Sequence, residues 1–209
     1  GEEKYLYTEK IIVNHYPDST KSRSSYLPLL ELAIKENPEN DRNMHYLGRE
    51  YMYYGKYEEA ITTLEKHLNL KSATWKDERC ASMRFIARCY MKLNRSKEAL
   101  MWANMAIKES PYLRDPYMEK ALITYELKKY KETEKLCLEA LKIKKHPKTY
   151  INEAFTTDLN IYDILAVVCF NNGKYRSSLK YINKALELDN DNERLNNNKK
   201  IIENVLIAI

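Results

Sequence analysis

Two pairs of cationic or cationisable side chains are the residues of this sequence best suited to chemistry. His45 and Arg49 stand four residues apart, and so do Arg84 and Arg88. Residues at this spacing share one face of a helix. Guanidinium groups donate paired hydrogen bonds to planar oxyanions. If the two helices lie side by side, the pairs together predict a site for a carboxylate, a phosphate or an acidic peptide.

The sequence carries none of the common catalytic motifs. It has no G-x-x-x-x-G-K-[ST] or G-x-G-x-x-G phosphate loop, no H-E-x-x-H and no G-x-S-x-G. The four histidines, at positions 15, 45, 67 and 146, are far apart, and the cysteines at 80, 89, 137 and 169 form no C-x-x-C pair. We therefore predict that this chain is not an enzyme, binds no metal and needs no cofactor.

A recurring helix pair is the element that must position the cationic residues. The first small residue of each unit recurs in steps of 39, 34 and 45 residues, which is repeat spacing: Gly48, Ala87, Ala121 and Ala166. A second small residue follows twelve positions later in every unit: Ala60, Ala99, Thr133 and Ser178. Antiparallel helices approach closely only where small side chains meet. Each unit is therefore predicted to be a helix hairpin that crosses at its two small residues.

The repeated pattern also carries a family resemblance. The second helices have an apolar stripe with the 3.6-residue period of an amphipathic helix. Leu47-Gly48-x-x-Tyr51 followed by Gly55-x-Tyr57-x-x-Ala60, with its three recurrences, resembles the tetratricopeptide repeat family. The resemblance implies an all-α, right-handed superhelix of stacked helix hairpins, with four repeats over residues 41–192. It departs in the third repeat, where Thr133 replaces alanine, and at an insertion over residues 144–159.

The flanking segments are predicted to cover the ends of this stack. Residues 21–40 are predicted to contain a capping helix, and residues 193–209 a second one. Because the second one carries several apolar side chains, we also expect it to pair with a copy of itself in a homo-oligomer. Residues 1–20 are rich in β-branched and aromatic residues, which favours a short extended or β segment, a remnant of a preceding domain.

In stacked helix pairs the first helices line the concave surface, and the cationic pairs fall on these helices. The predicted peptide-binding residues are Arg42, His45, Arg49, Tyr53, Arg84, Arg88, Lys92 and Tyr125. The set is similar to the carboxylate clamp with which some tetratricopeptide domains hold the acidic C-terminus of a chaperone, although His and Arg replace its Lys and Asn. We expect an interaction scaffold that binds an acidic or extended protein segment. The alternative is that Glu50, Asp77, Glu78 and other acids neutralise the arginines within the stack.

A second resemblance points to a larger protein. The run Ile12-Val13-Asn14-His15-Tyr16, continuing into Asn43-Met44-His45-Tyr46-Leu47-Gly48, resembles the junction in bacterial family-2 glycosyltransferases that carry a C-terminal tetratricopeptide domain. This resemblance implies an acceptor-recognition or oligomerisation domain of a nucleotide-sugar-dependent enzyme. It further implies that His15 would help to ligate the metal of the sugar diphosphate, but only in a full-length enzyme.

Composition limits the remaining function classes. A hydrophobic content of 44% with 31% charged residues is typical of a soluble globular protein. The net charge of +5 is modest and is not concentrated in a basic arm, so nucleic acid is not an expected partner. No apolar run approaches the roughly 20 residues that span a bilayer, so we expect no membrane association. Cysteines that fall mainly on core positions favour a reducing, cytoplasmic compartment.

Overall fold

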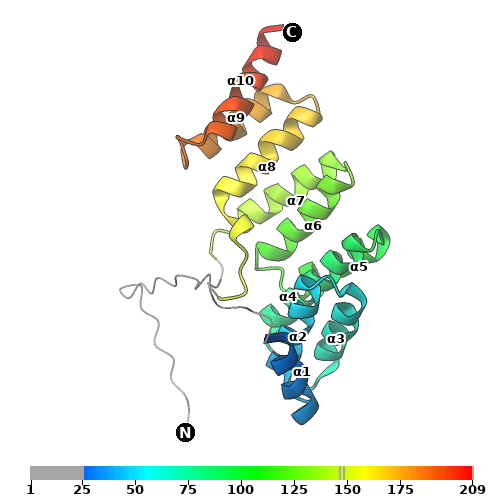
Figure 1. Ribbon diagram of the computed structural model, residues 1–209. Coiled ribbons are helices and arrows are strands. Elements are labelled where there is room, and N and C mark those ends of the chain that lie inside the picture. Colours follow the sequence, from blue (N-terminus) through cyan, green and yellow to red (C-terminus); the bar gives the residue numbers. More distant parts are fainter. Residues whose placement is uncertain (1–25, 146, 148, 209) are drawn as a thin grey trace.

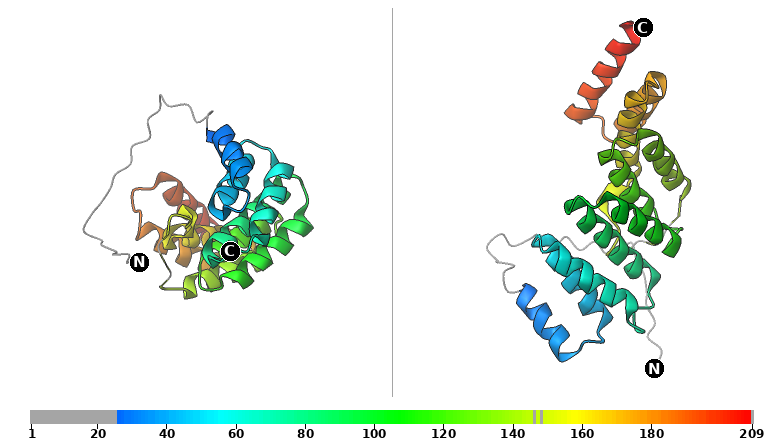
Figure 2. Two further views of the ribbon diagram at one scale, coloured as in Figure 1. Left: turned by 90° about the horizontal axis from the view of Figure 1, so that it is seen from below. Right: turned by 90° about the vertical axis from the view of Figure 1, so that its right-hand side faces the viewer.

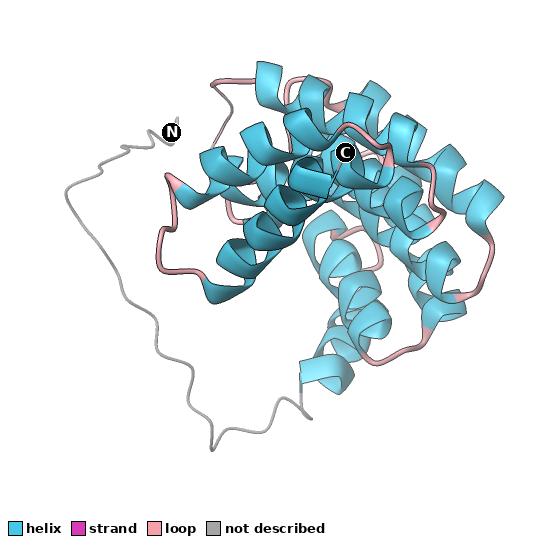
Figure 3. Cartoon of the chain, turned by 90° about the horizontal axis from the view of Figure 1, so that it is seen from above, coloured by secondary structure: helices cyan, strands magenta, loops and turns pink. Residues whose placement is uncertain are grey.

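The computed structural model describes residues 26–145, 147 and 149–208. In this part of the chain all regular elements are helical, and the helices stack into an elongated array (Figure 1). Seen along the stack, the helices follow an arc (Figure 3). The predicted all-α superhelix of stacked hairpins is therefore confirmed. The extended segment predicted for residues 1–20, and His15 with it, lies outside the described residues.

Four helix hairpins form the body of the stack. Their helices are α2 (Asp41–Tyr53) with α3 (Tyr57–Asn69), α4 (Lys76–Lys92) with α5 (Ser96–Glu109), α6 (Asp115–Glu126) with α7 (Tyr130–Lys142), and α8 (Asp158–Asn171) with α9 (Tyr175–Leu186). Helix α1 (Tyr26–Glu36) precedes them and α10 (Glu193–Ala208) follows them. The insertion between α7 and α8 contains one short 3-10 helix, η2 (Ala154–Thr156).

The turn inside each hairpin uses the same backbone conformation. Gly55 and Gly173 have φ angles of 74° and 72°, and Asn94 and Lys128 occupy the equivalent turns with φ of 59° and 57°. A left-handed residue directly after a helix lets the next amide groups bond back to the last carbonyl groups. Glycine and asparagine adopt this conformation readily, so three of the four turns carry the residue that the geometry favours.

The small residues mark the crossing points of the hairpins, as the spacing predicts. Ala60, Ala87 and Ala99 are fully buried, and the polar substitutes Thr133 and Ser178 are buried as well. The substitutes keep their hydroxyl groups bonded. Thr133 Oγ1 lies 2.9 Å from the Thr124 hydroxyl, and Ser178 Oγ donates to the Ala166 carbonyl at 2.7 Å. The hairpins therefore tolerate a hydroxyl at the crossing because it finds a partner there.

Gly48 packs directly against Leu64 of α3, and we expect its substitution by alanine to destabilise the chain. A Cβ at this position would lie 2.5 Å from Leu64 Cγ and 2.6 Å from Leu64 Cδ2. Leu64 is fully buried, so it moves away only by displacing its own packed neighbours. Overpacking of this kind costs about 1–3 kcal/mol, more than the gain in helix propensity of up to about 1 kcal/mol. Urea unfolding of Gly48→Ala measures the loss. Leu64→Ala should cost less stability in the Gly48→Ala background than in wild type, because it removes the atoms that the new Cβ meets. Equal stability of Gly48→Ala and wild type would contradict the close approach.

The first helices of the hairpins form a continuous row. Helix α2 contacts α4, and α4 contacts α6. In the next step of the row, η2 contacts both α6 and α8, so the insertion lies between the third and fourth hairpins. In a curved stack the elements that approach each other most closely lie on the inner side. We call the surface formed by α2, α4, α6 and α8 the inner surface.

Capping helices close the two ends of the array (Figure 2). Leu27 and Leu30 of α1 pack with Leu47 of α2. At the other end α10 buries Leu195 and Ile202 against the fourth hairpin, whereas the side chain of Ile207 is 84% exposed. The self-pairing expected for this last helix stays a prediction. None of the described helices has both the length and the apolar character needed to cross a membrane.

Candidate peptide-binding site

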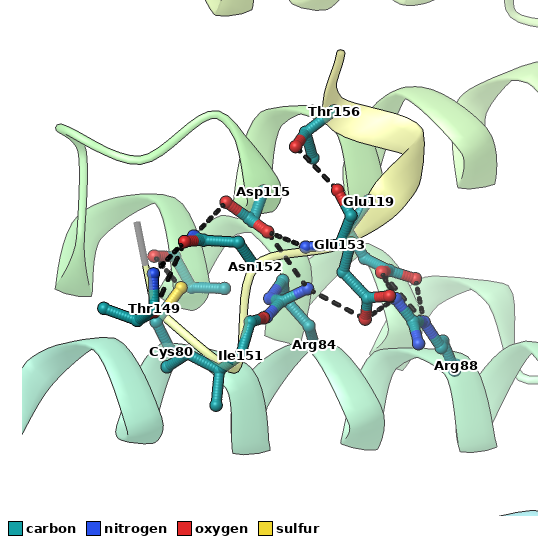
Figure 4. A network of polar contacts seen from close by, with 11 residues as sticks. Cys80, Arg84, Arg88, Asp115, Glu119, Thr149, Ile151, Asn152, Glu153 and Thr156 are labelled. Carbon is teal, nitrogen blue, oxygen red and sulfur yellow. Dashed lines mark hydrogen bonds and ion pairs between the residues drawn. The ribbon is translucent and has the colours of Figure 1, made fainter. Parts of the chain in front are cut away.

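A segment of the insertion occupies the part of the inner surface where the arginines converge. Residues 149–153 lie against α4 and α6, and Glu153 points its carboxylate at both predicted arginines (Figure 4). Arg84 Nη1 donates to Glu153 Oε1 at 3.2 Å, and Arg88 Nη2 donates to the same oxygen at 2.7 Å. The structure therefore brings the two arginines together and fills the site between them with a carboxylate of the chain itself.

Arg84 differs most from the expectation of an open cationic groove. Its side chain is 1% exposed, and its guanidinium lies 3.8 Å from the carboxylate of fully buried Asp115. Arg84 Nη2 also donates to the Ile151 carbonyl at 3.0 Å. The prediction that Arg84 projects into an open groove is wrong, because α6 and the insertion together cover it.

Arg88 lies at the border of the covered region. Its Nε donates to both carboxylate oxygens of Glu119 at 2.9 Å, in addition to the bond with Glu153. Burial opposes the charged form, but Glu119 and Glu153 outweigh it and raise the pKa of Arg88 above its usual range. The side chain is 25% exposed, so part of this guanidinium remains accessible.

His45 is buried and does not line the groove, so this part of the prediction is wrong too. Ser82 Oγ lies 2.7 Å from His45 Nδ1 and 2.9 Å from His67 Nδ1. His67 Nε2 lies 3.5 Å from the carboxylate of Glu78, and the Tyr150 hydroxyl donates to that carboxylate at 2.6 Å. Burial dominates over the nearby charges and lowers the pKa of His45 to about 3, so its ring is neutral at pH 7.

Most of the acids that neutralise the arginines are not among the three named in the alternative interpretation. Asp77 accepts a hydrogen bond from Tyr112, and Glu78 faces His67. Of the three acids named, Glu50 lies near an arginine, at 3.6 Å from Arg49. The neutralising residues Asp115, Glu119 and Glu153 come from α6 and from the insertion. Acids within the stack therefore pair with the arginines, as the alternative predicts, but Asp77 and Glu78 are not among them.

The remaining predicted residues define an open part of the inner surface. A cleft of about 430 Å³ lies between the ends of α2, α4 and α6. It is lined by Met52, Tyr53, Tyr57, Arg88, Met91, Lys92, Glu119, Leu122, Ile123 and Glu126. Three predicted residues, Tyr53, Arg88 and Lys92, therefore meet in one cleft. The cleft combines an apolar lining with charges of both signs.

Arg49 borders a neighbouring hollow that shares Tyr53 with the cleft. Its guanidinium carbon lies 4.9 Å from the centre of the Tyr46 ring and 6.0 Å from that of Tyr53. Arg42 is exposed near the start of α2, and Tyr125 is exposed on α6 with its ring against Tyr130. Arg42 and Tyr125 lie outside the lining of the cleft.

Arg114 is a positioning residue that the sequence analysis missed. It precedes α6 and donates to the carbonyl groups of Ile143 and Thr156, at 2.8 and 3.3 Å. It also pairs with Asp158 at 2.6 Å. The same guanidinium thus holds the two ends of the insertion. No spacing pattern in the sequence links Arg114 to these partners, because they lie 29 to 44 residues away.

One further hollow lies near the C-terminal end of the stack. An apolar hollow of about 180 Å³ lies between α8 and α10 and is lined by Ala166, Val167, Phe170, Asn198, Ile201 and Ile202. Asp115 and Met118, which helical spacing also projects toward the groove, are fully buried. Among the described residues, no group of three or more His, Cys, Asp or Glu side chains is placed to hold a metal ion.

Comparison with known proteins relates this architecture to tetratricopeptide repeats. Residues 159–192, which span most of α8 and α9, match the model of the tetratricopeptide repeat family. No curated protein sequence matches the chain. The glycosyltransferase resemblance is therefore a prediction that these comparisons do not support.

Solved structures of tetratricopeptide repeat proteins have the same fold. A crystal structure of MamA matches with a TM-score of 0.63 and 17% identity, covering 84% of this chain and 97% of that one. TTC0263, a thermophilic repeat protein of Thermus thermophilus, matches with a TM-score of 0.58 and 19% identity, covering 84% of this chain and 88% of that one. YrrB, described as a repeat protein with an unusual peptide-binding site, matches with a TM-score of 0.60 and 14% identity. The match covers 84% of this chain and 82% of that one. At these identities the likeness establishes the fold alone: the chain has the architecture of a tetratricopeptide repeat superhelix.

Proposed function

We propose that this chain is a protein-interaction scaffold that binds an extended segment of a partner protein in the cleft between α2, α4 and α6. The observation that carries the proposal is the convergence of Tyr53, Arg88 and Lys92 on one cleft of about 430 Å³. The cleft adjoins the place where residues 149–153 already lie, since Arg88 borders both. A surface that already holds one short, non-helical segment of chain is suited to receive another beside it.

The lining of the cleft indicates the chemistry of the bound segment. Met52, Met91 and Leu122 offer an apolar surface for an aliphatic or aromatic side chain. Lys92 is exposed and has no ion-pair partner among the described residues, so it is available to a carboxylate. Concave sites of this kind combine mostly apolar contact with a few polar groups that fix orientation. We propose a partner segment with an apolar residue close to an acidic one.

The fold is consistent with this use. Stacked repeats present an extended concave surface whose side chains vary without changing the scaffold. The structural neighbour YrrB is described as having a peptide-binding site, which shows that a related superhelix binds peptides. The identity of the partner is a property of the few side chains in the cleft and not of the fold.

Selection of peptides from a random nonapeptide library on the purified chain tests the proposal. We expect the enriched peptides to contain an apolar residue near Asp or Glu. Leu122→Asp should weaken a selected synthetic peptide at least about tenfold, because it places a charge in the apolar lining. Lys92→Ala should weaken it by about two- to fivefold, the usual effect of an exposed ion pair. Fluorescence anisotropy measures both affinities.

Two matched variants make the result specific. Lys108→Ala removes an exposed lysine from the second helix α5 and should leave the affinity unchanged. Glu126→Gln removes an acidic group from the cleft and should strengthen binding of an acidic peptide. If no peptide is selected, this cleft is not the binding site. The same conclusion follows if Leu122→Asp and Lys92→Ala leave the affinity of the selected peptides unchanged.

A further inference from the structure

Residues 149–153 contact the inner surface in the way that a bound peptide would. The Ile151 carbonyl accepts from Arg84 Nη2 at 3.0 Å, and the Glu153 amide donates to Asp115 Oδ1 at 2.7 Å. The Asn152 side-chain amide donates to the other oxygen of Asp115 at 3.1 Å. Side chains of α4 and α6 therefore bind backbone groups of this segment. The segment itself is a turn, in which the Asn152 amide donates to the Thr149 carbonyl at 3.2 Å.

Two side chains of the segment occupy distinct positions. The Tyr150 hydroxyl donates to Glu78, and its ring lies 5.6 Å from that of Trp75. Ile151 is buried and joins the hydrophobic core that is formed mainly by the first two hairpins. With Glu153 between the arginines, the surface holds an aromatic, an aliphatic, an amide and an acidic residue in that order. The chain thereby displays the type of sequence that its own inner surface accepts.

When the Glu153 carboxylate moves away, Arg84 and Arg88 each keep another carboxylate partner. Arg84 lies 3.8 Å from the Asp115 carboxylate, and Arg88 keeps its bonds to Glu119. Two guanidinium groups thus face two carboxylates on the helices, and Glu153 is a third carboxylate. A buried ion whose partner is removed would be costly, but here each arginine retains one. The Tyr150 side chain is 52% exposed, so the segment is also open to solvent.

From these contacts we propose that residues 149–153 are an intramolecular ligand that competes with a partner segment of the same chemistry. The partner is a protein segment that can adopt the same turn, with an aromatic, an aliphatic, a polar and an acidic residue in sequence. This proposal rests on the proposed function, since it too assigns peptide binding to the inner surface. While the segment is docked, the region between α4 and α6 is closed, and a partner gains it by displacing the segment.

The competition has a quantitative consequence. A tethered segment acts at an effective concentration in the millimolar range when its linker is short and flexible. A free peptide with the same contacts is therefore excluded from the wild-type chain at micromolar concentrations. Weakening the docked segment removes this competitor and leaves the helices that form the site unchanged.

The experiment uses a fluorescent nonapeptide with the sequence of residues 149–157 as the probe. Ile151→Asp introduces a charge where the segment is buried, and Glu153→Ala removes its contact with both arginines. Ala154→Asp is the matched control, because Ala154 is exposed and directly follows the segment. We expect both release variants to bind the nonapeptide at least tenfold more tightly than wild type and Ala154→Asp. A nonapeptide with alanine in place of its glutamate should lose this binding.

Circular dichroism establishes that each variant retains its helices, so a folding failure is recognised. If folded Ile151→Asp and Glu153→Ala bind the nonapeptide no better than wild type, the segment is a permanent part of the inner surface and the proposal is wrong. Equal binding by all four proteins would also overturn it, since nothing would then be occluded. Peptides selected for the cleft at Lys92 and Leu122 report on the proposed function separately, because their binding does not require release of the segment.

Discussion

Arg84→Met is expected to lower the free energy of unfolding by about 3–5 kcal/mol. The substitution keeps most of the side-chain volume but removes the cation beside fully buried Asp115. It also leaves the Ile151 carbonyl without its guanidinium donor. Removing one member of a buried ion pair costs this much because the remaining charge is stranded away from water. Urea denaturation at pH 7, followed by circular dichroism, measures the loss.

A double-mutant cycle separates the ion pair from general packing. Asp115→Asn alone should cost less than Arg84→Met, because Arg84 keeps Glu153 at 3.2 Å. The double variant should be more stable than the sum of the two single losses by about 1–3 kcal/mol. Strict additivity, or a loss below about 1 kcal/mol in Arg84→Met, would contradict the burial of this pair.

Acid is expected to destabilise the chain already between pH 6.5 and 5, and His45 is the cause. Its pKa falls from 6.5 to about 3 on folding because burial outweighs the opposite effect of Glu78. In this window the unfolded chain binds a proton that the folded chain does not, so stability rises with pH. The contribution approaches about 1.4 kcal/mol per pH unit at the acidic end of the window. It continues until the pH reaches about 3.

His45→Asn tests this assignment because its amide can still reach Ser82 but does not titrate. The variant should be less stable than wild type at pH 7 and should show a smaller slope of stability against pH between 5 and 6. Phe85→Leu, which alters the ring stacked on His45, should lower stability by a similar amount at both pH values. The pKa of Glu78 is lowered too, since its bonds to His67 and Tyr150 outweigh burial, and its stabilising effect is lost at lower pH. An unchanged slope in His45→Asn would contradict the assignment to His45.

The sequence was sufficient to predict the stack but not the state of its cations. Periodicity and small residues such as Gly48 and Ala60 are local properties, and local spacing determines how two adjacent helices cross. Whether Arg84 is exposed depends on residues 115 and 153, which are 31 and 69 positions away. Such pairings are not encoded in the spacing of one helix. The insertion was recognised as a departure from the repeat pattern, yet its position on the inner surface could not be derived.

The predicted residues that line the cleft share a feature. Tyr53 and Lys92 stand at the ends of α2 and α4, beyond the reach of the insertion. His45 and Arg84 stand nearer the middle of the same helices, where the neighbouring hairpin and the insertion pack on them. A projection from helical spacing alone therefore works best at helix ends and fails where a later segment of the chain covers the helix.

The most direct test of peptide binding on the inner surface is a methyl NMR titration with a peptide selected from the nonapeptide library. Met52, Met91 and Leu122 line the cleft, whereas Met101 and Met105 are exposed on α5, the second helix of its hairpin. We predict that the signals of Met52, Met91 and Leu122 shift with the added peptide while those of Met101 and Met105 stay in place. Shifts confined to Met101 and Met105 would place the binding surface on the second helices and contradict the proposed function.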